Sequence, residues 1–289
     1  MSKEAALQTI DQGADQIREP GRPADKDEAE FRNLFILRGR SSRRAEALVA
    51  AVACLLVLAA WEIAARLRLT NPIFLPAPSE VAAALWRMST ADDLLLQAGI
   101  STLRVWIAFL ISAVMAIPIG ILMSSYRIVG AALEPIVDFI RYLPVPALVP
   151  LSIIWFGVGE ETKIFLLWLG TFFQLVLLVA DDMRRVPHEY IETALTLGAK
   201  PRQVLSDVAV RAMLPNLVDS LRITLGWCWT YLIIAEIVAA QSGIGFVIWT
   251  ARRYMKTPEV MAGVVAIGII GLVTDQLLRY LHRRLFRYL

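Results

Sequence analysis

The strongest constraint on this chain is a series of long apolar segments, of which residues 105–126 contain no charged side chain. A segment of that length and composition can cross a bilayer as a helix, because an α-helix satisfies its backbone hydrogen bonds internally. The whole chain is 57% hydrophobic and only 19% charged, which leaves a water-soluble fold too little polar surface. These values place the chain among polytopic membrane proteins.

Six segments qualify as spans, so we predict an all-α, polytopic membrane protein with six transmembrane helices. The predicted spans are residues 47–65, 105–126, 136–157, 164–180, 221–240 and 260–280. We expect residues 1–44 to form a polar cytoplasmic tail and residues 45–289 to form the transmembrane domain. Arginine clusters precede the first span and follow the last, which predicts a multi-pass protein of the cell membrane with both termini in the cytoplasm.

The segment between the first two spans, residues 70–102, is predicted to be a structured loop on the outer side. Pro72, Pro76 and Pro78 exclude a continuous helix at its start. Ser79, followed by Glu80 and a run of alanines, indicates a short helix that begins nearby.

A second insertion, residues 181–219, separates the fourth and fifth spans on the predicted cytoplasmic side. Its first part, residues 187–197, has the apolar spacing of a short amphipathic helix, and Gly198 is suited to end that helix. Pro201 then suits the first turn of a second helix. Because long loops in compact proteins are usually functional, we expect this insertion to have a specific function.

At this insertion the sequence resembles a known family. Glu192-Thr193-Ala194, followed by Gly198, Val208 and Pro215, is similar to the "EAA" signature of permeases in binding-protein-dependent ABC importers. Residues 74–81, 143–150, 155–160 and 242–246 are similar to the subgroup that imports nitrate, sulfonates, taurine and bicarbonate. Two positions depart from the family pattern, namely Thr193 in place of alanine and Val210-Arg211 in place of Leu-Pro.

The resemblance implies the fold of a type I ABC importer permease, in which this insertion couples the membrane helices to an ATPase. It assigns the coupling role to Tyr190, Glu192, Thr193, Ala194, Leu197, Gly198, Val208 and Pro215. The partners it implies are two cytoplasmic ABC ATPase subunits, an extracytoplasmic solute-binding protein and a second copy of the permease. The solute it implies is a small anion such as nitrate, bicarbonate or a sulfonate.

No G-x-x-x-x-G-K-[ST] pattern occurs in the chain, so we expect no cofactor here and ATP with Mg²⁺ on the partner ATPase. The chain is therefore predicted to be a transport subunit and not an enzyme. Its only histidines, His188 and His282, fall at predicted membrane edges, which argues against a histidine-based metal centre. The basic residues flank apolar segments and form no patch with interleaved aromatics, so we expect no nucleic-acid partner.

Polar side chains inside the spans are candidates for the translocation path, because charge or amide groups are costly in lipid. Gln174, Thr230 and Glu236 are the candidates, with Thr171 and Thr224 beside them. Hydrogen bonding between helices is at least as good an explanation for the threonines and Gln174. Glu236 could be a pore or gate residue, or a buried carboxylate that stabilises the bundle.

Further expectations concern charged residues, and two alternative functions stay open. Arg104 and Arg141 could favour the passage of anions, although Arg104 is predicted instead to extend from a helix end toward the membrane surface. Asp275 is predicted to form a local ion pair with Arg279. A secondary transporter or channel that uses Glu236 or Asp275 as an ion or proton site is an alternative function. A membrane scaffold that transports nothing is a second alternative.

Overall fold

The computed structural model describes residues 43–286 except residues 70, 72 and 240. The predicted cytoplasmic tail, residues 1–44, therefore lies almost entirely outside the described residues. The chain divides into two units, residues 1–67 and residues 68–289. The first unit contributes one described helix, α3 (Arg43–Arg66), which contains the predicted first span and carries a Glu62–Arg66 ion pair of 2.6 Å near its end.

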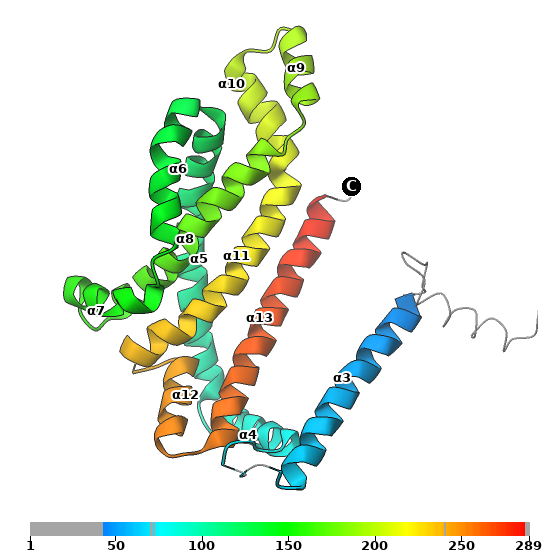
Figure 1. Ribbon diagram of the computed structural model, residues 1–289, viewed down its shortest axis with the longest axis vertical. Helices are drawn as coiled ribbons and strands as arrows, with labels where there is room; N and C mark the ends of the chain where they lie inside the picture. The colour runs from blue at the N-terminus through cyan, green and yellow to red at the C-terminus, as the bar shows by residue number, and fades with distance from the viewer. Residues whose placement is uncertain (1–42, 70, 72, 240, 287–289) are drawn as a thin grey trace, which may run out of the picture. The chain divides into compact units, whose positions relative to one another are not determined.

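Four long helices form the body of the second unit and lie alongside one another (Figure 1). They are α5 (Leu94–Ser125), α8 (Glu160–Arg184), α11 (Val210–Ala239) and α13 (Thr257–Leu285). Helix α8 packs along both α5 and α11, and α13 packs against α11. The short helices α4 (Pro78–Thr90) and α12 (Ile244–Arg253) lie at one end of this unit, and α9 (His188–Thr196) lies at the other.

Helix α4 confirms the short helix predicted after the proline-rich segment. It begins at Pro78, and the Glu80 carboxylate accepts a hydrogen bond of 3.2 Å from the Ala77 backbone N–H. This contact caps a helix end whose first N–H groups have no partner within the helix. Val81 and Met88 of α4 are buried against Ala262 and Ala266 of α13.

The third predicted span, residues 136–157, is wrong as a single helix. The structure has two helices there, α6 (Arg127–Arg141) and α7 (Val145–Phe156), which are bent by 98° at the break. Pro144 explains the break, because proline disfavours helical backbone at the preceding residue and has no N–H to donate. Among the described residues, five helices are long and apolar enough to cross a membrane, or six when this bent pair is one span.

The second half of the 181–219 insertion also differs from the prediction. Helix α10 (Pro201–Gln203) runs through the π-helical turn η1 (Val204–Ala209) directly into α11. The predicted second short helix is therefore continuous with the fifth span, which begins well before residue 221. Pro215 lies inside α11 and does not end it.

The interior of the second unit is apolar and tightly packed. Val105, Leu166 and Leu232, from α5, α8 and α11, each have no exposed surface. Its outward faces are apolar as well, since Val114 is 73% exposed and Leu272 is 59% exposed. An outward apolar surface suits lipid as the surrounding solvent.

Close approach of α5 and α8 depends on Gly120. A Cβ atom at this position would lie 2.7 Å from the Val176 backbone oxygen, which cannot move without shifting α8. Gly120→Ala should therefore lower the free energy of unfolding by about 1–3 kcal/mol, the usual cost of overpacking. Thermal unfolding of the purified chain in detergent measures this change.

Gly99→Ala is the matched control, because Gly99 lies in the same helix and a Cβ there would meet nothing within 4 Å. It should leave the melting temperature unchanged or raise it slightly. Equal destabilisation by both variants would show that the α5–α8 contact is not the cause.

Candidate functional site

The predicted coupling segment is a helix with a well-formed end. Helix α9 stops at Thr196, and Gly198 adopts a left-handed conformation with φ of +85°. The Ala199 N–H donates to the Ala194 oxygen at 3.0 Å, and the Gly198 N–H donates to the Leu195 oxygen at 2.9 Å. This pair of bonds is the Schellman motif, which glycine favours because other residues resist positive φ.

Helix α9 presents its side chains outward, since it contains no buried residue. Leu197 is 82% exposed and Tyr190 is 54% exposed, while Glu192 and Thr193 are exposed beside them. Ala194 is partly buried, and α9 packs against η1. Exposed apolar side chains at the end of a helical bundle are typical of a surface that a partner protein covers.

The remaining predicted coupling residues lie on the second half of the insertion. Val208 is partly buried within η1, and Pro215 is partly buried in the second turn of α11. Arg211, which departs from the family pattern, is exposed and lies 3.7 Å from Asp207. The structure thus brings the α9 residues and the η1 residues together, whereas Pro215 lies farther along α11.

The predicted path residues have three different environments. Gln174 is partly buried beside a small cavity that Arg141, Gly170 and Tyr231 also line, and neither Thr230 nor Glu236 borders it. Thr230 is exposed, and its hydroxyl donates to the Gly226 oxygen at 3.4 Å.

Two of the other polar threonines are satisfied within the bundle. The Thr171 and Ser112 hydroxyls are 2.8 Å apart and join α8 to α5, and the Thr224 hydroxyl donates to the Ser220 oxygen at 2.9 Å. The Thr171–Ser112 contact is the interhelical hydrogen bond that the structural interpretation expects, whereas the Thr224 contact lies within α11.

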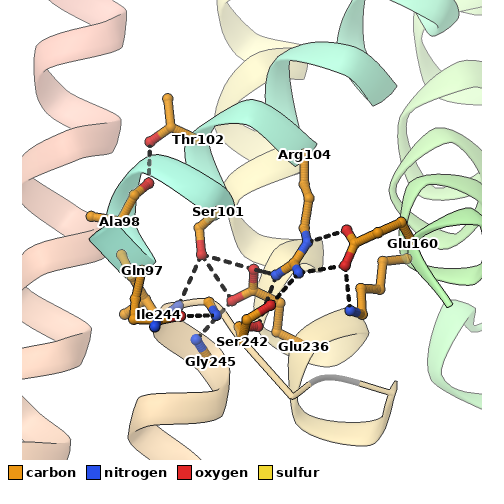
Figure 2. Close-up of polar contacts among 12 residues, drawn as sticks. Gln97, Ala98, Ser101, Thr102, Arg104, Glu160, Glu236, Ser242, Ile244 and Gly245 are labelled. Carbon is orange, nitrogen blue, oxygen red and sulfur yellow. Dashed lines mark hydrogen bonds and ion pairs between the residues drawn. The ribbon is translucent and has the colours of Figure 1, made fainter. Parts of the chain in front are cut away.

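Glu236 lies in a buried polar cluster centred on Arg104 (Figure 2). The Glu236 side chain is 0% exposed, and Arg104 is 3% exposed. The Arg104 Nη1 donates to Glu236 Oε1 at 2.7 Å, while Nε and Nη2 each donate to a Glu160 oxygen at 2.6 Å. The prediction that Arg104 extends from a helix end is wrong, because α5 begins at Leu94 and places Arg104 inside the bundle.

The turn between α11 and α12 completes the cluster. Arg104 also donates to the Ser242 backbone oxygen at 2.8 Å and to the Ser242 hydroxyl at 2.7 Å, so all five of its N–H donors are used. The Glu236 carboxylate accepts from the Ser101 hydroxyl at 2.7 Å and from the Gly245 N–H at 2.8 Å. A buried ion pair is tolerated when its remaining hydrogen-bonding groups are satisfied in this way.

Glycine is required where this turn approaches Glu236. Gly243 has a φ of +105°, and a Cβ atom at Gly245 would lie 2.6 Å from the Glu236 Cβ. The Gly243 N–H donates to Gln97 Oε1 at 2.6 Å, and the Ile244 N–H donates to the Ser101 hydroxyl at 2.9 Å. The Ser-Gly-Ile-Gly segment is therefore shaped to enclose the carboxylate.

Sequence reasoning missed Ser101, Lys163 and the pairing of Arg104 with Glu160. Arg104 and Glu236 are each a lone charge in or beside an apolar segment. That shared feature was the sequence signal from which their pairing could have been predicted. Asp275 follows its prediction, with an Arg279 contact of 3.3 Å, and it lies 3.1 Å from Arg222 as well. Within the described ranges, no group of three or more His, Cys, Asp or Glu side chains could hold a metal ion.

Removing the charge of Glu236 should destabilise the fold, because Arg104 would keep its buried charge with one partner lost. We expect Glu236→Gln to lower the free energy of unfolding by about 3 kcal/mol, the lower range for breaking a buried pair. Glu189→Gln, on the exposed face of α9, is the control and should change stability by less than about 0.5 kcal/mol. Denaturation of both variants in detergent measures the difference, and equal stability would contradict a structural role for Glu236.

The sequence is similar to that of known membrane transport proteins. Residues 100–287 match the family described as the inner membrane component of binding-protein-dependent transport systems. The taurine transport system permease protein of Escherichia coli is 36% identical over 234 residues, covering 79% of this chain and 85% of that protein. The bicarbonate transport system permease protein of Synechococcus elongatus is 31% identical over 188 residues, covering 65% of this chain and 68% of that protein.

A solved structure supports the same fold. A chain of the inward-facing MetNI methionine ABC transporter superposes with a TM-score of 0.56 at 22% identity, covering 68% of this chain and 95% of that one. The family match spans the buried cluster, the exposed α9 helix and the last span together. The chain therefore belongs to the family of inner-membrane components of binding-protein-dependent transport systems, and it is the membrane-spanning permease subunit of an ABC importer.

Proposed function

We propose that this permease translocates a small oxyanion, such as a sulfonate or bicarbonate, which a solute-binding protein delivers to it. The names of two relatives support this solute class, since one is a taurine permease and the other a bicarbonate permease. Taurine carries a sulfonate group, so both named solutes present negatively charged oxygens. Two buried cations near one end of the second unit, Arg104 and Lys163, suit the same chemistry.

The observation that carries the mechanism is the exposed helix α9, which lies in the chain between α8 and α11, two long helices that pack against each other. Helix α8 leads into α9 through three residues. After residues 197–200, helix α10 continues through η1 into α11 without a break. A force applied to α9 or η1 would therefore act on both α8 and α11. We assign Tyr190, Glu192, Thr193, Ala194, Leu197, Gly198, Val208 and Pro215 to this coupling surface.

The partner of the coupling surface is a cytoplasmic ABC ATPase that binds ATP and Mg²⁺. The family supports ATPase and binding-protein partners in general. We further propose two ATPase subunits and a homodimer of this permease, with α9 and both termini in the cytoplasm. The chain carries no cofactor in this scheme.

Transport then follows from alternating access. ATP binding favours one arrangement of the paired ATPases, and hydrolysis favours another. The coupling surfaces transmit that difference to α8 and α11, which open the bundle toward one side and then the other. The permease supplies geometry and a path, while the free energy comes from nucleotide bound to the partner.

The geometry gives less support to the alternative of a secondary transporter. Such a transporter would use Glu236 or Asp275 as an exchangeable ion or proton site. Glu236 is paired with Arg104, and Asp275 lies within 3.3 Å of both Arg222 and Arg279. Both carboxylates are already engaged by arginine side chains, so an exchangeable cation would have to break those contacts to bind there.

Reconstitution distinguishes the two functions. The permease is incorporated in liposomes with its ATPase, and the binding protein is added outside with labelled taurine or bicarbonate. We expect uptake into the liposomes to require ATP in the liposome lumen and the binding protein in the external solution. Uptake by the permease alone would instead support the secondary transporter.

Docking to the ATPase should depend on Leu197. Since this side chain is already 82% exposed, Leu197→Asp should leave folding stability nearly unchanged while placing a charge in the proposed apolar contact. We expect the variant to lose about tenfold or more in ATPase co-purification and to lose uptake, because one apolar anchor is worth about 1.5–3 kcal/mol.

Met255→Asp is the matched control for this prediction. Met255 is 66% exposed in the turn between α12 and α13, at the end of the second unit opposite α9. It should retain the ATPase at the native level. If both variants retained the ATPase equally, α9 would not be the docking surface.

A further inference from the structure

Three cationic N–H groups converge on one carboxylate in the buried cluster. Arg104 Nε and Nη2 each lie 2.6 Å from a Glu160 oxygen, and Lys163 Nζ lies 2.7 Å from Glu160 Oε1. The two cationic side chains are 3% and 6% exposed, whereas Glu160 is 53% exposed. The donors are therefore fixed in the protein interior, and the acceptor is the part of the cluster that reaches water.

The charges in the cluster explain why an anion is needed at the Glu160 position. Arg104 and Lys163 carry two positive charges, and Glu236 balances one of them from a fully buried position. Glu236 is held in place by Ser101 and by the Gly245 N–H. If the Glu160 side chain turned outward, one positive charge would remain buried without a partner, which is costly unless another anion replaces it.

Glu160 is placed where its side chain can turn outward. It is the first residue of α8 and follows Gly157-Val158-Gly159, in which Gly157 has a φ of +75°. The end of α7 at Phe156 precedes this turn. An anion in place of the carboxylate would also meet the partial positive charge of the α8 N-terminus.

The geometry of the donors selects the class of anion. Two parallel N–H groups of a guanidinium match two oxygens of one carboxylate, sulfonate or bicarbonate group. The Lys163 ammonium adds a third donor to one of those oxygens. A spherical ion such as chloride cannot use the paired donors in the same way.

We propose that Arg104 and Lys163 form an oxyanion-binding site that Glu160 occupies in this structure, and that the transported solute displaces Glu160 there. This inference rests on the proposed function for its substrate class. Glu160 then acts as an internal competitor that keeps the affinity of the permease low. Low affinity favours release, because the solute is exchanged for a carboxylate already present in the chain.

The test is binding of ethanesulfonate to the full-length permease in lipid nanodiscs, measured by titration calorimetry at constant ionic strength. In Glu160→Gln the competing charge is gone, so we expect affinity about tenfold or more above that of the native chain. Adding Lys163→Gln to this variant should return the affinity toward the native value. Lys163 contacts Glu160 and takes no part in the Arg104–Glu236 contact, so the second change leaves that pair intact.

Glu161→Gln is the matched control, because it removes the same charge from an exposed neighbour in the same turn. It should bind ethanesulfonate as the native chain does. The proposal would be overturned by equal gains in Glu160→Gln and Glu161→Gln, by no gain in Glu160→Gln, or by equally tight binding of chloride. If Glu160→Gln does not fold, Glu160→Asp replaces it, because aspartate keeps the charge but has a shorter side chain. Glu160→Asp should bind ethanesulfonate more tightly than the native chain does, and no gain in affinity would equally overturn the site.

The result is separable from the proposed function. Uptake of the oxyanion by the reconstituted importer without tighter binding in Glu160→Gln would reject this site alone. Tight binding in the variant without any ATP-dependent uptake would reject the transport proposal and leave the site.

Discussion

The arrangement of the second unit depends on one buried cation, Arg104, which must be fully paired because an isolated charge in a low-dielectric interior is very costly. Its five donors reach Glu160 on α8, Glu236 on α11 and Ser242 in the turn before α12, while the arginine itself belongs to α5. Three regions that are far apart in the sequence, namely α5, α8 and the junction of α11 with α12, are therefore held at one point. Apolar packing alone would not fix their register so closely, since lipid competes equally well for apolar side chains.

Two of those segments, α8 and α11, also lead to the coupling surface. These two helices therefore connect the two ends of the bundle. Helix α8 begins at Glu160 and ends shortly before α9, and α11 begins after η1 and carries Glu236 near its other end. Both carboxylates of the Arg104 cluster are thus attached to the α9–η1 insertion through a single helix each. A partner that moves the insertion would act on the cluster without any further contact, and the solute site and the ATPase site would share the same two helices.

Much of this architecture could be predicted from the sequence, because apolar length and glycine or proline position are local signals. The α4 start, the α9 end at Gly198 and the long spans follow from such signals. The role of Arg104 did not, since a span defined by uncharged residues stops at the first charge, whereas α5 continues to Leu94. Its partner Glu236 is 132 residues away, and only the packing of helices brings the two together. The 98° bend at Pro144 and the continuity of η1 with α11 were not predicted either. Both depend on how two neighbouring helical segments join, which the composition of each segment does not determine.

Nucleotide bound at the α9 end should change the geometry at the Arg104 end, because α8 and α11 connect the two ends. Spin labels are attached at residues 161 and 254 of the assembled importer, in a Cys54→Ser background. Double electron–electron resonance between them reports the distance from the start of α8 to the turn after α12. We expect that distance distribution to shift when a non-hydrolysable ATP analogue is added and to remain fixed in Leu197→Asp. Identical distance distributions with and without nucleotide in the otherwise native importer would show that nucleotide does not change the geometry at the Arg104 end.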